Sequence, residues 1–176
     1  MLSAAQSGDE AAFSQLWRDA NPALVRYLHV VAGQDPEDVA AETWVSVVRG
    51  LKRFRGDEVA WRAWLFTTAR RRAVDEGRRR LRRIDVVMAD LPEAHGQGPA
   101  DPAQLALDGL DNAAVVSAIR SLPRGQAEVI MLRVVGGLPV EAVARLVGST
   151  PGAVRVASHR GLKRLAQMVA EADVTL

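Results

Sequence analysis

Two breaks in the C-terminal third of the chain separate three segments with helical apolar spacing, and this pattern leaves few folds open. Apolar residues within 129–135 predict a first helix, which Gly136 and Gly137 end. Apolar residues recur at helical spacing over 140–146, and a short turn follows at residues 147–148. Because a further helix can start directly after that turn, the pattern predicts a helix-turn-helix.

The helix after the turn is expected to begin near Pro151. Ser149 or Thr150 can cap it, and proline at the first helical position costs no hydrogen bond. Its packing face is predicted to consist of Val154, Leu162 and Leu165. The opposite and flanking sides carry the side chains that we predict to contact phosphates and base edges: Thr150, Arg155, Ser158, His159, Arg160, Lys163 and Arg164. DNA is therefore the expected partner.

Composition favours helices throughout. Abundant alanine, leucine, arginine and glutamate, with few alternating β-branched runs, predict an all-α protein of two small helical domains. The chain has no cysteine, which excludes disulfides and cysteine-ligated zinc. Its histidines, His29, His95 and His159, are scattered, so we expect no catalytic site, no metal site and no cofactor. No run of about 18 apolar residues and no secretory signal is present, so we expect a cytoplasmic protein without membrane insertion.

Charged side chains are segregated along the chain. Residues 1–51 carry three basic and seven acidic side chains, whereas residues 52–83 carry twelve and four. Residues 84–112 carry six acidic side chains and no basic one, and residues 113–176 carry eight basic and four acidic. Since prolines and glycines also gather at 85–112, this segment is predicted to be a flexible acidic linker between a domain at 1–84 and a domain at 113–176.

Aromatic and arginine side chains are interleaved in the basic block of the first domain. Such a combination can hold single-stranded DNA, because aromatic faces stack on bases while guanidinium groups follow the phosphates. Core packing is the other interpretation; we favour it for Trp64 and Phe54 and leave it open for Trp61. The residues predicted to bind DNA here are Phe54, Arg55, Trp61, Arg70, Arg71, Arg72, Arg78 and Arg79.

Spacings of three and four between apolar residues predict several amphipathic helices over residues 9–83, one of which starts after Asp35 at Pro36. Asp38 and Glu42 project from one face of that helix, because they are four residues apart. No intrahelical cation occupies the matching position. Taken alone, these two acids are typical of a solvated helix face.

These motifs together resemble the extracytoplasmic-function (ECF) sigma factors of bacterial RNA polymerase over nearly the full length of the chain. In the first domain the resemblance rests on the segments 36–44 (PEDVAAETW), 53–56 (RFRG) and 64–70 (WLFTTAR). In the second domain it rests on the segments 122–129 (LPRGQAEV), 141–144 (EAVA) and 152–155 (GAVR). The order of the two blocks and the linker between them make the resemblance specific.

The resemblance implies a non-enzymatic factor that directs promoter-specific transcription initiation. Its first domain would dock on the coiled coil of the polymerase β′ clamp through Asp38 and Glu42, and residues 54–83 would open and bind the −10 promoter element. Its second domain would sit on the β flap and place the helix from Pro151 in the major groove of the −35 element. A separate anti-sigma factor is the implied regulator.

Four positions depart from the family pattern. Ala41 replaces a common glutamine, and Arg71 replaces a common asparagine. On the recognition helix, Val156 and Ala157 stand where a small polar residue and an arginine are usual. Because neither side chain can donate a hydrogen bond, base reading is expected to shift to Arg155, His159 and Arg160.

Two other functions are considered. An autonomous helix-turn-helix regulator that binds duplex DNA without polymerase would explain residues 113–170 but not the aromatic and arginine block. A nucleic-acid-processing enzyme would need clustered carboxylates, whereas the acids of that block are interspersed with arginines. The sigma factor is favoured because it uses both parts of the chain.

Overall fold

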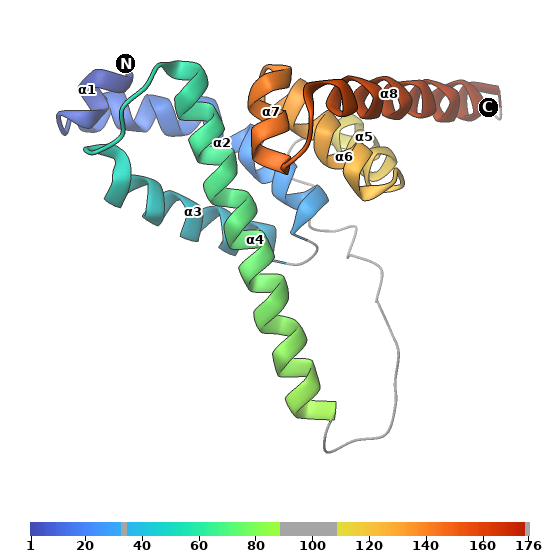
Figure 1. Cartoon of the computed structure of the whole chain (residues 1–176), viewed down its shortest axis with the longest axis horizontal. Coiled ribbons are helices and arrows are strands. Elements are labelled where there is room, and N and C mark those ends of the chain that lie inside the picture. The colour runs from blue at the N-terminus through green and yellow to red at the C-terminus, as the bar shows by residue number, and fades with distance from the viewer. Residues whose placement is uncertain (33–34, 89–108, 175–176) are drawn as a thin grey trace.

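The computed structural model describes residues 1–32, 35–88 and 109–174, and every regular element among them is helical. The N-terminal unit contains α1 (Leu2–Gln6), α2 (Glu10–Val31), α3 (Pro36–Leu51) and α4 (Glu58–Met88) (Figure 1). The C-terminal unit contains α5 (Gly109–Arg120), α6 (Arg124–Ile130), the π-helical turn η2 (Met131–Val135), α7 (Val140–Val147) and α8 (Pro151–Val174). The predicted all-α class with two small helical domains is confirmed. None of the described helices has the length and apolar character needed to cross a membrane.

The structure revises both ends of the predicted linker. α4 continues to Met88 and α5 begins at Gly109, so residues 85–88 and 109–112 are helical instead of forming linker. The remainder of the predicted linker, residues 89–108, lies outside the described residues. The extension of α4 has a simple cause, because residues 81–88 contain neither proline nor glycine and nothing there ends a helix.

α2 is a single long helix that accounts for much of the first part of the segment 9–83, where several amphipathic helices are predicted. The Asp9 side chain caps it by accepting a hydrogen bond from the Ala12 amide at 2.9 Å. The helix then runs for 22 residues with Pro22 inside it. Its inner face is fully buried along Leu16, Leu24 and Leu28. α3 begins at Pro36 as predicted.

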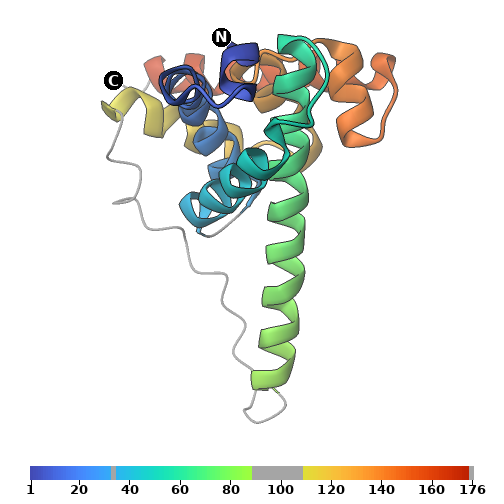
Figure 2. The same ribbon diagram turned by 90° about the vertical axis from the view of Figure 1, so that its left-hand side faces the viewer.

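α4 is the longest helix and has two different halves. The Asp57 side chain caps its start by accepting a hydrogen bond from the Ala60 amide at 2.8 Å. The first half packs into the core through Trp61, Leu65 and Phe66. The second half projects away from the rest of the molecule, as Figures 1 and 2 show, and its Leu81 is 64% exposed. Residues 77–82 on this projecting half are exposed.

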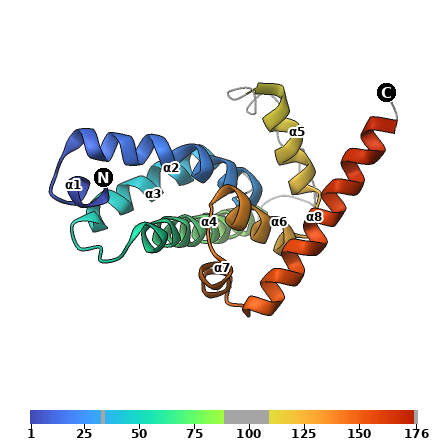
Figure 3. The same ribbon diagram turned by 90° about the horizontal axis from the view of Figure 1, so that it is seen from above.

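The two units pack against each other. η2 and α6 lie on α2, and α7 lies beside α4 (Figure 3). At this boundary the rings of Tyr27 and Phe66 meet edge to face, with centroids 5.3 Å apart. Gly136 of the C-terminal unit allows the two units to come this close, because a Cβ at this position would lie 3.1 Å from the Phe66 ring. The apolar core is therefore continuous from one unit to the other.

The predicted helix-turn-helix is present in the C-terminal unit. α7 ends at Gly148, whose φ of 69° is left-handed, and Thr150 caps α8 by accepting a hydrogen bond from the Ala153 amide at 3.2 Å. The packing face of α8 differs from the prediction at Leu162, which is 46% exposed. Gly161 takes that place, because α8 lies so close to α6 that a Cβ at Gly161 would be 2.5 Å from Ile130 Cδ1.

Candidate nucleic-acid and polymerase surfaces

The outer face of α8 carries the predicted duplex-binding side chains together. Thr150, Arg155, His159, Arg160, Lys163 and Arg164 are exposed, and Ser158 is half-buried. Arg155 forms an ion pair with Glu141 of α7, with 3.3 Å between Nη2 and Oε1, and both side chains remain more than half exposed. Surface pairs of this kind contribute little and are easily exchanged for a phosphate. The face is therefore basic and accessible along its length.

The structure places Trp61 in the core, which corrects its assignment to a DNA surface. The side chain is 1% exposed. Its ring lies between those of Trp44 and Trp64, at centroid distances of 6.3 Å and 5.7 Å. A base cannot stack on a face that other aromatic rings cover, so Trp61 supports the surface above it without forming part of it.

Phe54 and Trp64 form the half-buried rim of this aromatic cluster. Their rings are stacked, with centroids 5.2 Å apart and 19° between the planes. Trp64 also closes on the backbone of α3, since a Cβ at Gly50 would lie 2.7 Å from its ring. One side of the Trp64 ring is therefore packed in the protein, as the core interpretation favoured for this residue requires. Phe54 is the aromatic side chain at the edge of the basic block.

The loop from 52 to 57 is held in place from the N-terminus. Gln6 Nε2 donates hydrogen bonds to the carbonyl oxygens of Phe54 and Leu51, at 2.8 Å and 3.2 Å. Arg55 donates to the Phe54 carbonyl at 2.8 Å and is itself exposed. Sequence reasoning missed Gln6, because nothing in a polar residue of a short N-terminal helix indicates a partner 48 residues away.

The arginines of α4 have three different environments. Arg71 is exposed, and Arg78 and Arg79 are exposed with partners only one turn away, at 4.0 Å and 3.5 Å. Arg72 reaches across to α3, where it donates to Ser46 Oγ at 2.8 Å. Arg70 is half-buried and contacts the C-terminal unit. The first three are free to take phosphates at little cost, because exposed pairs are weak.

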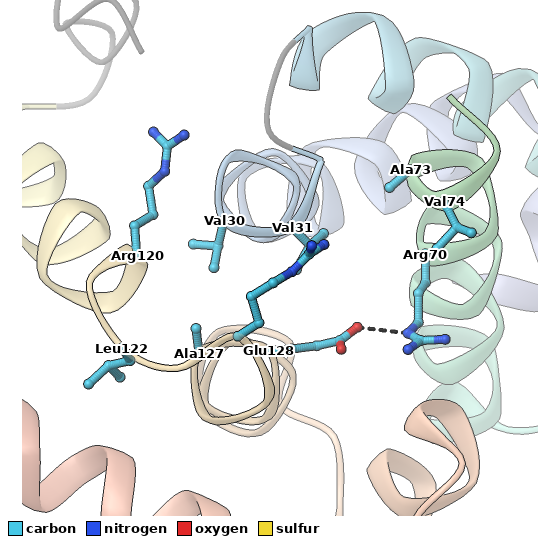
Figure 4. Close-up of a pocket in the computed structure, with 10 residues that line it drawn as sticks. Val30, Val31, Arg70, Ala73, Val74, Arg120, Leu122, Ala127 and Glu128 are labelled. Carbon is cyan, nitrogen blue, oxygen red and sulfur yellow. Dashed lines mark hydrogen bonds and ion pairs between the residues drawn. The ribbon is translucent and has the colours of Figure 1, made fainter. Parts of the chain in front are cut away.

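The contact of Arg70 is with Glu128 of α6. Arg70 Nε donates to Glu128 Oε1 at 2.7 Å (Figure 4). The Tyr27 hydroxyl donates to the same oxygen at 3.1 Å. Burial, and then the neighbouring Glu128 carboxylate, raise the pKa of Tyr27 well above its usual value of about 10. The hydrogen bond that Arg70 donates to Glu128 likewise raises the pKa of Arg70. Both donors therefore keep their protons at neutral pH.

Asp38 and Glu42 lie exposed on the outer face of α3, as predicted. Glu42 forms an ion pair with Arg72 of α4, whose guanidinium lies 3.4 Å from the Glu42 carboxylate. Asp38 has no ion-pair partner among the described residues. The two acids thus form an accessible patch at the junction of α3 and α4.

No site for a metal ion is found among the described side chains, since no three histidine or acidic residues cluster there. A groove of about 280 Å³ separates α4 from α7, and its charged lining is basic. It consists of Arg70 and Arg71 from α4 and Arg145 from α7. The arrangement suits the binding of anions and offers no catalytic pair.

Two sequence families match this chain. Residues 16–83 match Sigma-70 region 2, and residues 112–165 match Sigma-70, region 4. The chain is 33% identical over 180 residues to the ECF RNA polymerase sigma factor SigD of Mycobacterium tuberculosis, a match that covers 98% of this chain and 84% of SigD. It is 29% identical over 171 residues to the ECF RNA polymerase sigma factor BldN of Streptomyces coelicolor, covering 96% of this chain but only 64% of BldN.

Two solved structures have the same fold. The first is CnrH in complex with the cytosolic domain of CnrY, with a TM-score of 0.63, 24% identity, and coverage of 97% of this chain and 95% of CnrH. The second is the sigma factor RpoE in complex with the anti-sigma factor NepR from Bartonella quintana, with a TM-score of 0.65, 23% identity, and coverage of 90% and 97%. At this identity the likeness concerns the fold.

Proposed function

Because this chain belongs to the family of ECF RNA polymerase sigma factors, which bind RNA polymerase and give it promoter specificity, we propose that its two helical units bind separate promoter elements. The N-terminal unit binds and opens the −10 element, and the C-terminal unit binds the −35 element. Both steps are binding, so the chain has no active site and needs no cofactor. It acts in the cytoplasm, where polymerase meets promoter DNA.

The observation that carries this proposal is the presence of two separate basic faces, one on each of the two matched regions. The arginines of α4 lie in the region 2 match, and those of α8 lie in the region 4 match. An autonomous regulator needs only the second face and leaves residues 16–83 without a role. That alternative is therefore not favoured.

The −35 element is assigned to α8, which would enter the major groove with its basic face. Arg155, His159 and Arg160 are the side chains proposed to reach base edges, and Lys163 and Arg164 follow the phosphates. Val156 is 49% exposed on the same helix. It cannot donate a hydrogen bond, but an exposed valine can contact the methyl group of thymine.

The −10 element is assigned to α4 and the loop before it. Arg71, Arg78 and Arg79 supply accessible guanidinium groups for the phosphates of a single strand. Phe54 and Arg55 stand at the loop where an unstacked base would be received. Trp61 is left out of this set because it is buried.

Polymerase is assigned to the exposed acids of α3, Asp38 and Glu42, with the β′ clamp coiled coil as their partner and the β flap as the partner of the C-terminal unit. An anti-sigma factor is the proposed regulator. The fold neighbours CnrH and RpoE, the latter solved with an anti-sigma factor, support a regulator of this kind.

Two binding measurements test the proposal. Fluorescence anisotropy of the labelled chain should report tight binding to bacterial core RNA polymerase. A gel shift with promoter duplex should report a specific complex only when core polymerase is present. Strong, specific duplex binding by the chain alone, without affinity for polymerase, would instead support the autonomous regulator.

A further inference from the structure

One carboxylate of the C-terminal unit is hydrogen-bonded to two helices of the N-terminal unit. Glu128 Oε1 accepts hydrogen bonds from Tyr27 of α2 and Arg70 of α4, residues that are 101 and 58 positions away in the sequence. The Glu128 side chain is 19% exposed, and that of Arg70 is 37% exposed. Figure 4 shows the Arg70–Glu128 contact where α4 faces α6. Neither bond is local, so both depend on contact between the units.

The groups around Glu128 favour one particular contact between the units. A carboxylate removed from water is costly unless charged or polar donors satisfy it, and Glu128 has both kinds only while α6 rests on α2 and α4. The same boundary buries Phe66, Met131 and Leu132 completely. Apolar burial holds the units together, and the hydrogen-bonded ion pair fixes how they meet.

We call the arrangement in which the two units touch the closed chain. In the closed chain, the C-terminal unit occupies part of the proposed DNA surface. Arg70 is predicted from the sequence to bind DNA, but its Nε–H and its charge are already engaged by Glu128, so a phosphate must compete with that carboxylate for the guanidinium. The groove beside it is closed on its far side by α7, through Arg145 and Leu146. The C-terminal unit therefore covers the part of α4 nearest the core, while the projecting half stays open.

The closed arrangement also brings the two proposed DNA faces too close together. The −35 and −10 elements are separate stretches of promoter DNA, and each base pair between them adds about 3.4 Å of duplex. In the closed chain α7 touches α4 directly. Simultaneous contact with both elements requires the units to separate.

We propose that Glu128 is an internal competitor for DNA: it holds the free chain closed by occupying Arg70, and single-stranded DNA opens the chain by displacing it. The competition rests on the proposed function, which assigns α4 to the −10 strand, and on the prediction from sequence that Arg70 is one of the DNA-binding residues of α4. The closure itself does not, since it is a property of the free chain.

Distance measurement on the free, full-length chain tests closure. The chain has no cysteine, so spin labels at Ser14→Cys on α2 and Gln167→Cys on α8, both exposed positions, would be the only labels. Pulsed electron paramagnetic resonance should give one short distance for the parent chain. Glu128→Gln keeps the shape and removes the charge, and it should raise the fraction at longer distances about tenfold.

A matched control separates this effect from a general loss of charge. Glu141→Gln removes an exposed acid that pairs with Arg155 inside the C-terminal unit, and it should leave the distance distribution unchanged. Tyr27→Phe removes one of the two donors and should give a smaller opening. Identical distributions for the parent chain, Glu128→Gln and Tyr27→Phe would overturn the proposal.

Competition is tested by adding a single-stranded oligothymidine of about 20 nucleotides to the labelled parent chain and to the labelled Glu128→Gln variant. Binding should convert the short distance to the longer one, and Glu128→Gln should need several-fold less oligonucleotide. Binding without a change in distance would overturn the competition. Failure of the chain to bind core polymerase would contradict the proposed function while leaving the closure result intact, so the two failures are distinguishable.

Discussion

Tyr27 links the contact between the units to pH, because its hydroxyl proton is donated to Glu128. Its hydroxyl is buried against the Glu128 carboxylate, so deprotonation would place two negative charges side by side. Because the pKa of Tyr27 is raised in the folded state, its contribution to stability is complete below pH 10 or so, the unfolded value, and is lost as the pH rises toward the higher folded value.

The free energy of unfolding should therefore fall above about pH 10, with a slope of up to about 1.4 kcal/mol per pH unit from this one group. Urea unfolding between pH 8 and 11 measures the slope. Tyr27→Phe should reduce it, whereas a slope that is the same in both proteins would show that Tyr27 does not control the alkaline loss of stability.

Gly136 permits the closest approach at the boundary between the units. A Cβ there would lie 2.8 Å from the Leu132 carbonyl oxygen and 3.1 Å from the Phe66 ring. Gly136→Ala should therefore destabilise the protein by about 1–3 kcal/mol, as overpacking does. Urea unfolding measures this loss against Gly125→Ala, where nothing lies within 4 Å of the added carbon. Equal stability of the two variants would contradict the close packing.

Individual residues also show where sequence reasoning stops. Exposure of the basic side chains of α8 followed from helical periodicity alone. Trp61 could not be placed, because an aromatic residue in a basic block fits a core and a base equally well until its neighbours are known. Leu162 was assigned to the packing face because a pattern of apolar residues gives no weight to a glycine, yet Gly161 is where the helices touch.

At the scale of helices, α3 and α8 are assigned different partners, and variants should separate them. Asp38→Lys reverses a charge on an exposed acid that has no ion-pair partner among the described residues, so it should weaken binding to core polymerase without disturbing the fold. Arg160→Ala on α8 should leave polymerase binding intact and weaken use of the promoter, by about 1–3 kcal/mol if Arg160 contacts a base.

Anisotropy titrations with core polymerase and transcription assays on one promoter measure the two effects separately. Equal losses of polymerase binding in both variants would contradict this division. Asp38 is the sharper probe than Glu42, because Glu42 also pairs with Arg72, and a change there would alter the contact between α3 and α4.

Helix positions were largely predictable from local signals. The starts of α3 and α8 follow from Pro36 and Pro151, and the end of α7 follows from Gly148. The π-helical turn of η2 was not predictable, because its apolar residues fit an ordinary helix as well. The full length of α4 is not predicted, because the change from basic to acidic composition after residue 83 indicates a linker although the helix continues to Met88.

At the scale of the whole molecule, two units were predictable but their contact was not. Charge segregation and the gathering of prolines and glycines divide the chain without reference to structure. The contact depends on Tyr27, Arg70 and Glu128, which come from three distant helices and carry no shared sequence signal. Long-range pairs of this kind become visible only when the helices are placed in space.

As a sigma factor, this chain directs RNA polymerase to particular promoters. The most direct measurement combines the purified chain with bacterial core polymerase and genomic DNA and maps the 5′ ends of the transcripts. We expect initiation at discrete positions that share a −10 and a −35 sequence, and we expect Arg160→Ala to reduce it at the same positions. Transcripts that are the same with and without the chain would contradict the account.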